Sequence, residues 1–525
     1  MVHLRAVNVM LSILRTRQLI VPLLVIFIAL LIQTSWVGDD AFITMRTADN
    51  LVHGYGLRWN VDERVQSFTN PLWLFLVSGV YAIWGNSHLT LMFLSIVVSA
   101  LALFLLLVKV PQNNFGLVLA FGIFILSKAF VDYSSSGLEN PLTHLMLVSF
   151  AILYFQAEKP ISYRQLFLLG LIAGLAAFNR IDTFLFYLPV LLAILWMQHD
   201  RKTLCCMLAG FTPFLLWELF SIIYFGFPFP NTYYARLHMG IPAPTLIHQG
   251  FLYFFNSLGW DPITLTITLS ALALTFISGN SKEKLLAVGV CLYLIYVVSN
   301  GGDFMSGRFF TASLFVSVIL LVRRVEEGLL LEKWIWISIV LLLGLIMAPI
   351  KSFSDPLEGD LTTFDPGAGI ADERVGYYRY TNLLLLHKDL TLPPRPGFDL
   401  AKGLSGNDRV VIPETGIGMV GYFGGPRVHI IDIFGLADPL LARLPITNID
   451  DWRIGHFWRN DPAGYIETIK SGKNQLANPD LAKYYDQLHL IVSGDVWSLK
   501  RMEAIWKMNT GQYDYLLDLY TQSSR

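Results

Sequence analysis

Two adjacent acids, Asp39 and Asp40, follow the first apolar run of the chain, in the stretch TSWVGDDAFITMRTADN. Ionisable side chains are costly at a membrane boundary, so a pair of them there is a candidate functional site. Because two carboxylates this close repel each other, one of them would hold a raised pKa and serve as a general base. Alternatively, both would bind one divalent cation, such as Mg²⁺ or Ca²⁺, through oxygen ligands. An ordinary solvated helix cap is the third interpretation.

The residues after this acidic pair alternate at helical spacing between polar and apolar types. The polar stripe contains Thr44, Arg46, Thr47 and Asn50, and the opposite apolar face contains Ala41, Phe42, Met45 and Ala48. This pattern predicts an amphipathic helix that lies along a membrane surface. Arg46 would then point toward the polar side, where a guanidinium group can bind a phosphate.

Further polar residues collect in later loops, each of which also has an ordinary structural interpretation. Glu139 in SGLENP can cap the helix that starts at Pro141, and Arg180 and Asp182 can pair with each other. Asp303 and Arg308 flank a glycine-rich turn in GGDFMSGR, which allows close backbone approach. Other candidates that could bind sugar or phosphate are Asn231, Tyr234 and Arg236 in FPFPNTYYARLH, and His456 in RIGHFWR.

The composition indicates that these residues belong to a membrane protein. Of 525 residues, 54% are hydrophobic and only 15% are charged, whereas a soluble domain carries about 25% charge. The apolar residues form runs long enough to cross a bilayer, which needs about 20 residues. The net charge of −1 excludes the basic face that a nucleic-acid partner requires. The cysteines Cys205, Cys206 and Cys291 all lie in apolar runs, so we expect neither a disulfide framework nor a zinc site.

Lysine and arginine in short loops predict the topology, because such loops face the cytoplasm. Arg5, Arg15 and Arg17 precede the first apolar run, Gln18–Val37, which is too long for a signal-peptide core and reads as a retained helix. Further basic loops hold Lys109, Lys159 with Arg164, Arg201 with Lys202, Lys282 with Lys284, and Arg323 with Arg324 and Lys333. With all of these in the cytoplasm, spans fall near 88–108, 115–132, 141–156, 162–178, 181–198, 203–225, 261–279, 284–300, 307–322 and 331–350.

The segment Asn70–Trp84 is the exception to this scheme, because counting it as a span would reverse every later loop. It is short and contains Trp73, Tyr81 and Trp84, which prefer the membrane interface. We therefore predict a juxtamembrane or re-entrant helix, with an ordinary span as the alternative.

The predicted fold is an α-helical polytopic membrane protein with about eleven transmembrane helices and a C-terminal α/β soluble domain. Residues 1–350 would form the membrane domain and residues 351–525 the soluble one, joined by a linker from Lys351 to Asp372. The stretches DRVVIPE, RVHIIDIFG and LHLIVSG predict short buried strands. Between them, DPLLARL, DPAGYIETIK and WSLKRMEAIWKMN predict helices.

Seven stretches of the chain, which include the acidic pair and the polar loops described above, together resemble the GT-C class of polytopic glycosyltransferases. Enzymes of this class use lipid-linked sugars and place a catalytic aspartate in the first outer loop. The stretches are similar in particular to a bacterial group related to the mycobacterial terminal arabinofuranosyltransferases. The matching islands are DDAFITMRTADNLVHGYGLRWN, ERVQSFTNPLW, SGLEN, FGFPFPNTYYAR, GGDFMSGR, DPLLARLP and DWRIGHFWR. The chain departs from the group's pattern at Arg236, where lysine is usual, and in VDERVQSFTN, which leaves the sugar open.

The resemblance implies a polyprenyl-phosphate donor carrying a pentofuranose such as arabinofuranose, and a cell-envelope glycan or glycoprotein as acceptor. It places transfer on the periplasmic side of the inner (plasma) membrane, with the N-terminus cytoplasmic and the C-terminal domain periplasmic. Transfer needs a base for the acceptor hydroxyl, for which we assign Asp40 before Asp39, and cations for the leaving phosphate. The phosphate candidates are Arg46, Arg236 and Arg308, and the candidates for sugar or acceptor are Glu139, Arg180, Asp182, Asn231, Tyr234, Asp303 and His456. Beyond the alternative of a divalent cation at Asp39 and Asp40, the sequence identifies no cofactor.

The competing function is a transporter or flippase of a lipid-linked saccharide. Such proteins usually contain two related halves with interrupted helices at the membrane midplane. The sequence shows no related halves, and its charges lie at the predicted membrane boundaries. A purely structural membrane protein would not explain why the polar loops fall on one side.

Overall fold

The computed structural model describes residues 2–326, 335–336, 339, 342–343, 368–385, 400–401, 403–404, 406, 408–449 and 452–523. Its packing divides the chain into two compact units made of non-contiguous segments. Unit 1 comprises Met1–Gly38, His88–Pro213 and Ala243–Pro393, and unit 2 comprises Asp39–Ser87, Phe214–Pro242 and Pro394–Arg525. The predicted boundary at residue 350, the predicted span 331–350 and most of the predicted linker lie outside the described residues, so they stay predictions.

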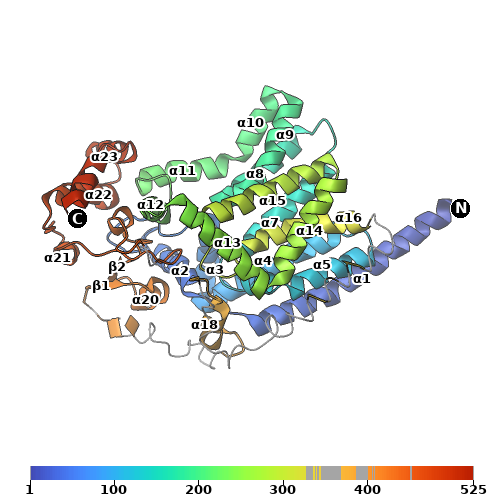
Figure 1. The fold of residues 1–525 in the computed structure, drawn as a ribbon, viewed down its shortest axis with the longest axis horizontal. Helices are drawn as coiled ribbons and strands as arrows, with labels where there is room; N and C mark the ends of the chain where they lie inside the picture. Colours follow the sequence, from blue (N-terminus) through green and yellow to red (C-terminus); the bar gives the residue numbers. More distant parts are fainter. Residues whose placement is uncertain are drawn as a thin grey trace. The chain divides into compact units, whose positions relative to one another are not determined.

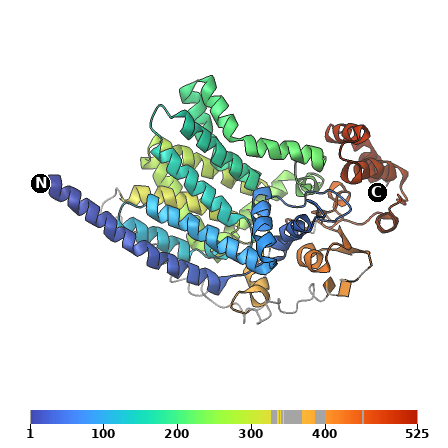
Figure 2. The same cartoon turned by 180° about the vertical axis from the view of Figure 1, so that it is seen from behind.

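The named elements of unit 1 among its described residues are all helices (Figure 1). Its elements are α1 (Val2–Thr34), α4 (Ser87–Lys109), α5 (Asn114–Leu126), α6 (Lys128–Tyr133), α7 (Asn140–Gln156), α8 (Tyr163–Asn179), η1 (Ile181–Phe186), α9 (Leu188–Gln198), α10 (Arg201–Gly210), α13 (Ala243–Trp260), α14 (Pro262–Ser278), α15 (Ser281–Ser299), α16 (Phe310–Glu326) and α18 (Glu373–Thr381). Figure 2 shows α1, α4 and α5 side by side, with the N-terminal part of α1 extending beyond its neighbours.

The centre of unit 1 is α16, which is buried on all sides from Phe310 to Val322. A helix that is apolar all round is expected in such a core position. The helices α5, α7, α14 and α15 pack around it. The outer helices approach one another through glycines: a Cβ at Gly170 of α8 would lie 2.5 Å from the Met207 carbonyl oxygen of α10. Small residues at helix contacts of this kind are typical of membrane bundles.

Polar caps set the helix ends of unit 1. Asn280 and Glu283 form a capping box at the start of α15, and the Asp261 side chain accepts the Thr264 N–H at the start of α14. Ser127 interrupts the predicted span 115–132, because its hydroxyl accepts the Phe130 N–H and starts the new helix α6. The predicted span 181–198 is likewise divided into η1 and α9.

The basic loops of unit 1 meet at one end of the helices. Lys282 donates to the carbonyl oxygen of Ala157 at the end of α7 (2.6 Å), and Arg323 pairs with Glu283 (3.0 Å). Glu326, at the end of α16, accepts the backbone N–H groups that follow α4, including that of Asn113. Because α7 is 17 residues long, its other end lies about 25 Å away. The structure therefore gathers the basic loops at one end, as the topology requires.

Among the described residues, α4 alone is a single helix long and apolar enough to cross a membrane. Up to four spans result if three bent pairs are counted, namely α1 with α2, α10 with α11, and α13 with α14. The sequence missed α13, and it predicted one span where α10 and α11 bend by 59°. Membrane character is thus supported by the helices, whereas the count of about eleven spans stays a prediction.

Unit 2 contains the remaining elements (Figure 1). They are α2 (Asp39–Val52), α3 (Pro71–Trp84), α11 (Thr212–Tyr224, from Phe214 onward), α12 (Asn231–Leu237), β1 (Val410–Glu414), α20 (Ile417–Gly424), β2 (Val428–Asp432), η4 (Leu441–Arg443), α21 (Tyr465–Ser471), α22 (Pro479–Ser493), α23 (Leu499–Asn509) and α24 (Asp514–Ser523). The segment Asn70–Trp84 is helical but only 14 residues long in α3, and its relation to the membrane stays a prediction.

The two described strands of unit 2 form a parallel pair with α20 as their crossover. Val410 lies opposite Val428 and Glu414 opposite Asp432. These are the strands predicted from DRVVIPE and RVHIIDIFG. The third predicted strand, LHLIVSG, is wrong, because it forms the end of α22. The buried residues of α22 recur at helical spacing: Leu481, Tyr484, Tyr485, Leu488, Ile491 and Val492.

The prediction of a surface helix at residues 39–52 is half right. The helix forms as α2, but both of its faces are buried, including Thr44, Arg46, Thr47 and Asn50 of the polar stripe. The polar side chains are buried because they bind other parts of unit 2; Asn50, for example, donates to the Trp59 carbonyl oxygen (3.0 Å). The stripe is therefore a polar packing surface, which sequence periodicity alone does not distinguish from a solvated one.

Candidate active site

The predicted site residues fall into two groups, one in each unit. Asp39, Asp40, Arg46, Asn231, Tyr234, Arg236 and His456 belong to unit 2, and Glu139, Arg180, Asp182, Asp303 and Arg308 belong to unit 1.

Asp39 and Asp40 form the first turn of α2 and are both half-buried. The two carboxylate oxygens of Asp39 accept the backbone N–H groups of Gly418 (Oδ2, 2.8 Å) and Met419 (Oδ1, 2.8 Å). These N–H groups belong to the first turn of α20, which leaves them without partners inside the helix. Asp39 therefore caps α20 from a distant part of the chain, and this contact positions α2.

Gly418 makes this cap possible. A Cβ atom at that position would lie 1.9 Å from the backbone oxygen of Asp39, so only glycine allows the two helices to approach this closely. The aromatic rings of Phe42 and Tyr422 pack at the next turn, with centroids 5.4 Å apart. The α2–α20 contact thus fixes the position of the turn that carries Asp40. The neighbouring carboxylate, Asp39, has a structural role in this contact.

Arg46 lies inside unit 2, only 2% exposed. Its guanidinium group stacks on Trp59, with Cζ 4.1 Å from the ring centroid, and donates to the Val428 carbonyl oxygen at the start of β2. Its Nε and Nη1 atoms have no hydrogen-bond partner among the described residues. These contacts connect α2 to the sheet, so the structure gives Arg46 a packing role and the predicted phosphate contact stays untested.

Asn231 and Tyr234 also serve the interior of unit 2. The Asn231 amide donates to the carbonyl oxygens of Gly435 (2.9 Å) and Asp438 (2.9 Å), and Arg443 donates to its oxygen. Tyr234 packs its ring on the Arg443 guanidinium group, 4.6 Å from Cζ to the centroid. The neighbouring cavity, which both residues line, holds about 10 Å³ and has room for no more than one water molecule.

Arg236 is different, because it is partly exposed at the end of α12. Among the described residues, no hydrogen bond or ion pair of its side chain is formed. Its neighbour Ala235 is instead buried and accepts a hydrogen bond from Arg459. Arg236 is therefore the best placed of the predicted phosphate ligands in unit 2 to bind an external anion.

His456 lies in a bend of the C-terminal segment, with its ring 5.0 Å from that of Phe434. Its Nδ1 atom is 3.1 Å from the Ile454 carbonyl oxygen. Burial lowers the pKa of His456 to about 4, so the ring is neutral at neutral pH. A neutral imidazole could still hydrogen-bond a hydroxyl group, but it adds no charge.

In unit 1, the five predicted residues converge in one ion cluster. The Glu139 carboxylate accepts hydrogen bonds from Arg180 Nη1 (2.7 Å) and Arg308 Nη2 (3.0 Å). Arg180 also holds Asp182 through two parallel bonds of 2.9 and 2.8 Å, and Arg308 Nη1 lies 3.7 Å from Asp303. Residues from α7, η1 and the loop before α16 therefore meet at a single point, the end of unit 1 opposite to the basic loops.

This cluster answers two of the questions that the sequence left open. Arg180 and Asp182 do pair, but Arg180 also bridges to Glu139. The Glu139 side chain makes no cap hydrogen bond to α7 and is buried between two arginines instead. With three carboxylates and two guanidinium groups, the cluster carries a formal charge of −1. Such a polar group is suited to hydrogen-bonding sugar hydroxyls rather than to attracting a phosphate.

A second ion cluster in unit 1 was missed by the sequence reading. Lys128 pairs with Asp132 and Asp372 (3.0 Å to the latter), and Arg374 pairs with Asp132 at 2.8 Å. The Trp260 indole N–H donates to Asp372 (3.1 Å). These contacts attach α18 to α6. Lys128 and Asp132 stand four residues apart within a predicted span, and such intramembrane charges were the available signal.

Unit 2 contains a further missed group around the first loop. His429 Nδ1 lies 2.9 Å from Asp62, which also pairs with Arg409 at 2.7 Å. Burial raises the pKa of the neighbouring Glu63 well above its usual range, and this carboxyl accepts a hydrogen bond from the Asn60 amide (3.0 Å). In the sequence, only the charge run DER marked this place.

No group of three or more histidine, cysteine, aspartate or glutamate side chains that could hold a metal ion occurs among the described residues. Both oxygens of Asp39 face the N-terminus of α20, whose partial positive charge disfavours a cation.

No protein-family model matches the chain. It is 25% identical over 516 residues to the "Terminal beta-(1->2)-arabinofuranosyltransferase" of Mycobacterium tuberculosis, and the match covers 81% of each chain. It is 23% identical over 521 residues to the protein of the same name in Corynebacterium glutamicum, covering 80% of this chain and 72% of that relative. The predicted resemblance is confirmed by both relatives.

Proposed function

We propose that this chain is a membrane glycosyltransferase that transfers arabinofuranose from a polyprenyl-phosphate donor to a cell-envelope glycan or glycoprotein. The observation that carries the proposal is the similarity to two terminal arabinofuranosyltransferases over four-fifths of the chain. The apolar helices supply the bilayer contact that a lipid-borne donor requires. Transfer would take place on the periplasmic side of the inner membrane, at the side away from the basic loops.

In the proposed reaction, an acceptor hydroxyl attacks the anomeric carbon of the donor sugar. The bond from that carbon to the phosphate oxygen breaks, and polyprenyl phosphate leaves with the electron pair. Asp40 takes the proton of the acceptor hydroxyl as the new glycosidic bond forms. Asp39 is a positioning residue, because its carboxylate is held by the Gly418 and Met419 N–H groups.

The other residues divide between phosphate and sugar. Arg236, partly exposed and without an ion pair in the described structure, would bind the leaving phosphate and stabilise its charge. The cluster of Glu139, Arg180, Asp182, Asp303 and Arg308 would hydrogen-bond sugar hydroxyls, with its ion pairs fixing each side chain in place. Arg46, Asn231 and Tyr234 would maintain the shape of unit 2.

The direct test uses the purified full-length chain with a panel of polyprenyl-phosphate sugars and an arabinan acceptor. We expect transfer from polyprenyl-phosphoryl-arabinofuranose, and little or none from the arabinopyranose, ribofuranose and mannose analogues. An Arg236→Gln variant should bind this donor less tightly, and Arg236→Lys should restore most of the loss. Transfer of another sugar would retain the enzyme class but overturn the donor, whereas no transfer from any donor would overturn both.

A further inference from the structure

The helix α23 and the residues just before it present large apolar side chains to the exterior. Trp497 is 76% exposed, Leu499 86% and Trp506 67%. Leu499 and Trp506 are seven residues apart and lie on one face of α23, opposite to its buried residues Arg501, Ala504, Ile505 and Met508. Three large apolar groups so exposed on one short segment need a partner.

Arg501 attaches this segment to the end of α11. Its Nη1 atom donates to the carbonyl oxygens of Ile223 (2.7 Å) and Val496 (3.1 Å), and its Nη2 atom donates to that of Tyr224 (2.8 Å). Because one nitrogen bridges Ile223 and Val496, the following residue, Trp497, lies beside the last turn of α11. At the other end of α23, Asn509 donates to the Gly226 carbonyl oxygen (2.8 Å).

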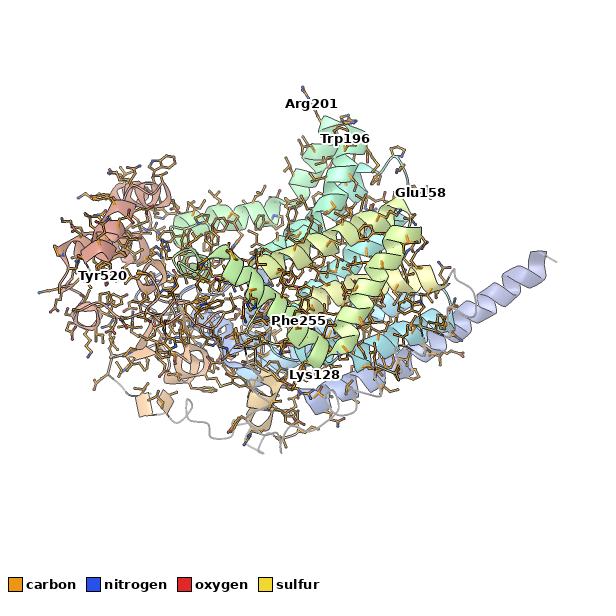
Figure 3. The ribbon with its side chains drawn as sticks, viewed as in Figure 1. Lys128, Glu158, Trp196, Arg201, Phe255 and Tyr520 are labelled. Atoms are coloured by element: carbon orange, nitrogen blue, oxygen red, sulfur yellow. The ribbon has the colours of Figure 1, made fainter. Side chains whose placement is uncertain are left out.

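The helix α11 is itself suited to hydrocarbon. Together with α10 it is apolar enough to form a bent span, and its exterior carries Leu215, Leu216, Leu219, Phe220 and Ile222, all exposed. The end of such a helix lies at the level of the lipid head groups, which is the depth that tryptophan prefers. Lys500 borders the apolar face of α23 and carries a charge that anionic lipids attract, whereas Lys507 pairs with Glu503 (2.6 Å). The helices α11 and α23 are shown in Figure 1, and Figure 3 shows the side chains that project from them.

We propose that Trp497, Leu499 and Trp506 form an interfacial anchor that inserts into the outer leaflet of the membrane and continues the lipid-facing surface of α11. The anchor binds a lipid surface and holds the C-terminal helices against it. This inference is independent of which sugar the chain transfers.

The anchor can be tested by spin-label depth measurements on the full-length protein. In a background in which Cys205, Cys206 and Cys291 are replaced by serine, single cysteines are placed at Trp497, Leu499 or Trp506 and labelled. The matched control is Lys483→Cys, on the neighbouring helix α22, where the side chain is 66% exposed but polar. The protein is reconstituted in phosphatidylcholine–phosphatidylglycerol vesicles, and collisions with oxygen and with a water-soluble nickel chelate are compared.

We expect the three anchor labels to collide several-fold more with oxygen, relative to the nickel chelate, than the label at residue 483 does. Equal nickel accessibility at all four positions in vesicles would overturn the proposal. Spin–spin broadening that grows with protein density would also overturn it and would identify a second copy of the chain as the occupant.

Discussion

Adjacent aspartates can have different roles when one of them is already used by the fold. Both carboxylate oxygens of Asp39 accept hydrogen bonds from backbone N–H groups in the first turn of α20. An amide at this position has only one oxygen, and its NH₂ group would face an N–H donor. We therefore expect Asp39→Asn to lower the stability of the protein by about 1–2 kcal/mol, as the loss of a helix cap does, with a partial loss of transfer.

At Asp40, we expect the larger loss of transfer. An Asp40→Asn variant should lose transfer by about 10²–10⁴-fold, the usual contribution of a general base, whatever change in melting temperature accompanies it. The measurements are the rate of transfer at saturating donor and the thermal unfolding of the purified protein. An active Asp40→Asn variant, or an inactive Asp39→Asn variant with unchanged stability, would exchange the two roles.

Glu139 provides a second contrast between single residues. Replacing it by glutamine leaves Arg180 and Arg308 buried without their shared carboxylate, which we expect to destabilise unit 1 by about 3–5 kcal/mol. The control is Glu158→Gln, at an exposed glutamate on the opposite end of the unit, where a change within about 0.5 kcal/mol is expected (Figure 3). Equal melting temperatures for the two variants would show that the ion cluster contributes little to stability.

At the scale of elements, the contact of α2 with α20 depends on one glycine. A methyl group at Gly418 would lie 1.9 Å from the Asp39 backbone oxygen, whereas at Gly416 it would meet nothing within 4 Å. We expect Gly418→Ala to cost about 1–3 kcal/mol or more and to reduce transfer sharply, because α20 must move away from the acidic turn. Gly416→Ala should leave both quantities near the parental values. If both variants show the same thermal unfolding and the same rate of transfer, α2 and α20 do not pack closely at Gly418.

The segment between β2 and η4 should make stability depend on pH. Burial raises the pKa of Asp438 to about 7 and that of Asp432 to about 6. A carboxyl with a raised pKa binds its proton more tightly in the folded chain, so its contribution to stability is full below about pH 4 and is lost as the pH rises through about 7. His456 has the opposite dependence, because its pKa is lowered to about 4 and its contribution is lost as the pH falls from 6.5 toward 4.

An Asp438→Asn variant isolates one of these groups. Relative to the parent, its melting temperature should rise progressively between about pH 4 and 7 and then stay level, since Asp438 titrates in that window in the parent alone, whereas Asp432 titrates in both proteins. The comparison with the parent at each pH removes the opposing contribution of His456. A difference that does not change with pH would mean that Asp438 keeps an ordinary pKa.

How far the sequence predicted these elements depended on whether the signal was local. Helix caps and apolar periodicity are local, so α4, α7, α8, α15 and the strands β1 and β2 fall where predicted. The strand prediction at Leu488–Gly494 was wrong because a short β-branched run outweighed the longer helical spacing of α22. Burial of the α2 stripe and the pairing of Lys128 with Asp372 depend on segments far apart in the chain, which periodicity does not reveal.

The same distinction applies to the candidate site. Residue types and spacing were enough to choose Glu139, Arg180, Asp182, Asp303 and Arg308, and the structure brings these five together. They were not enough to show that Asn231 binds backbone carbonyls inside unit 2, since an amide has the same appearance in either role. The sequence shows which chemistry a side chain can perform, but it does not show which partner that side chain binds.

At the scale of the whole molecule, the proposed enzyme requires that the acidic turn and the ion cluster face one aqueous compartment. Within unit 1, the basic loops lie at the end opposite to the cluster, which favours this arrangement. The sidedness can be measured with single cysteines in a variant that lacks the native ones. His53 is exposed just after α2, the helix that begins with the acidic turn, and Ser299 is exposed near the Gly-Gly-Asp turn. Glu158 and Arg201 mark the basic end (Figure 3).

In right-side-out vesicles, we expect a membrane-impermeant maleimide to label cysteines at positions 53 and 299 but not those at 158 and 201. Inverted vesicles should give the opposite result, and detergent should expose all four. The reason is that each of the helices α7, α8 and α16 carries the basic loop at one end and the cluster at the other, about 25 Å apart. Labelling of positions 53 and 299 from different sides would separate the proposed base from the proposed sugar-binding cluster, and a single active site containing both could not then form.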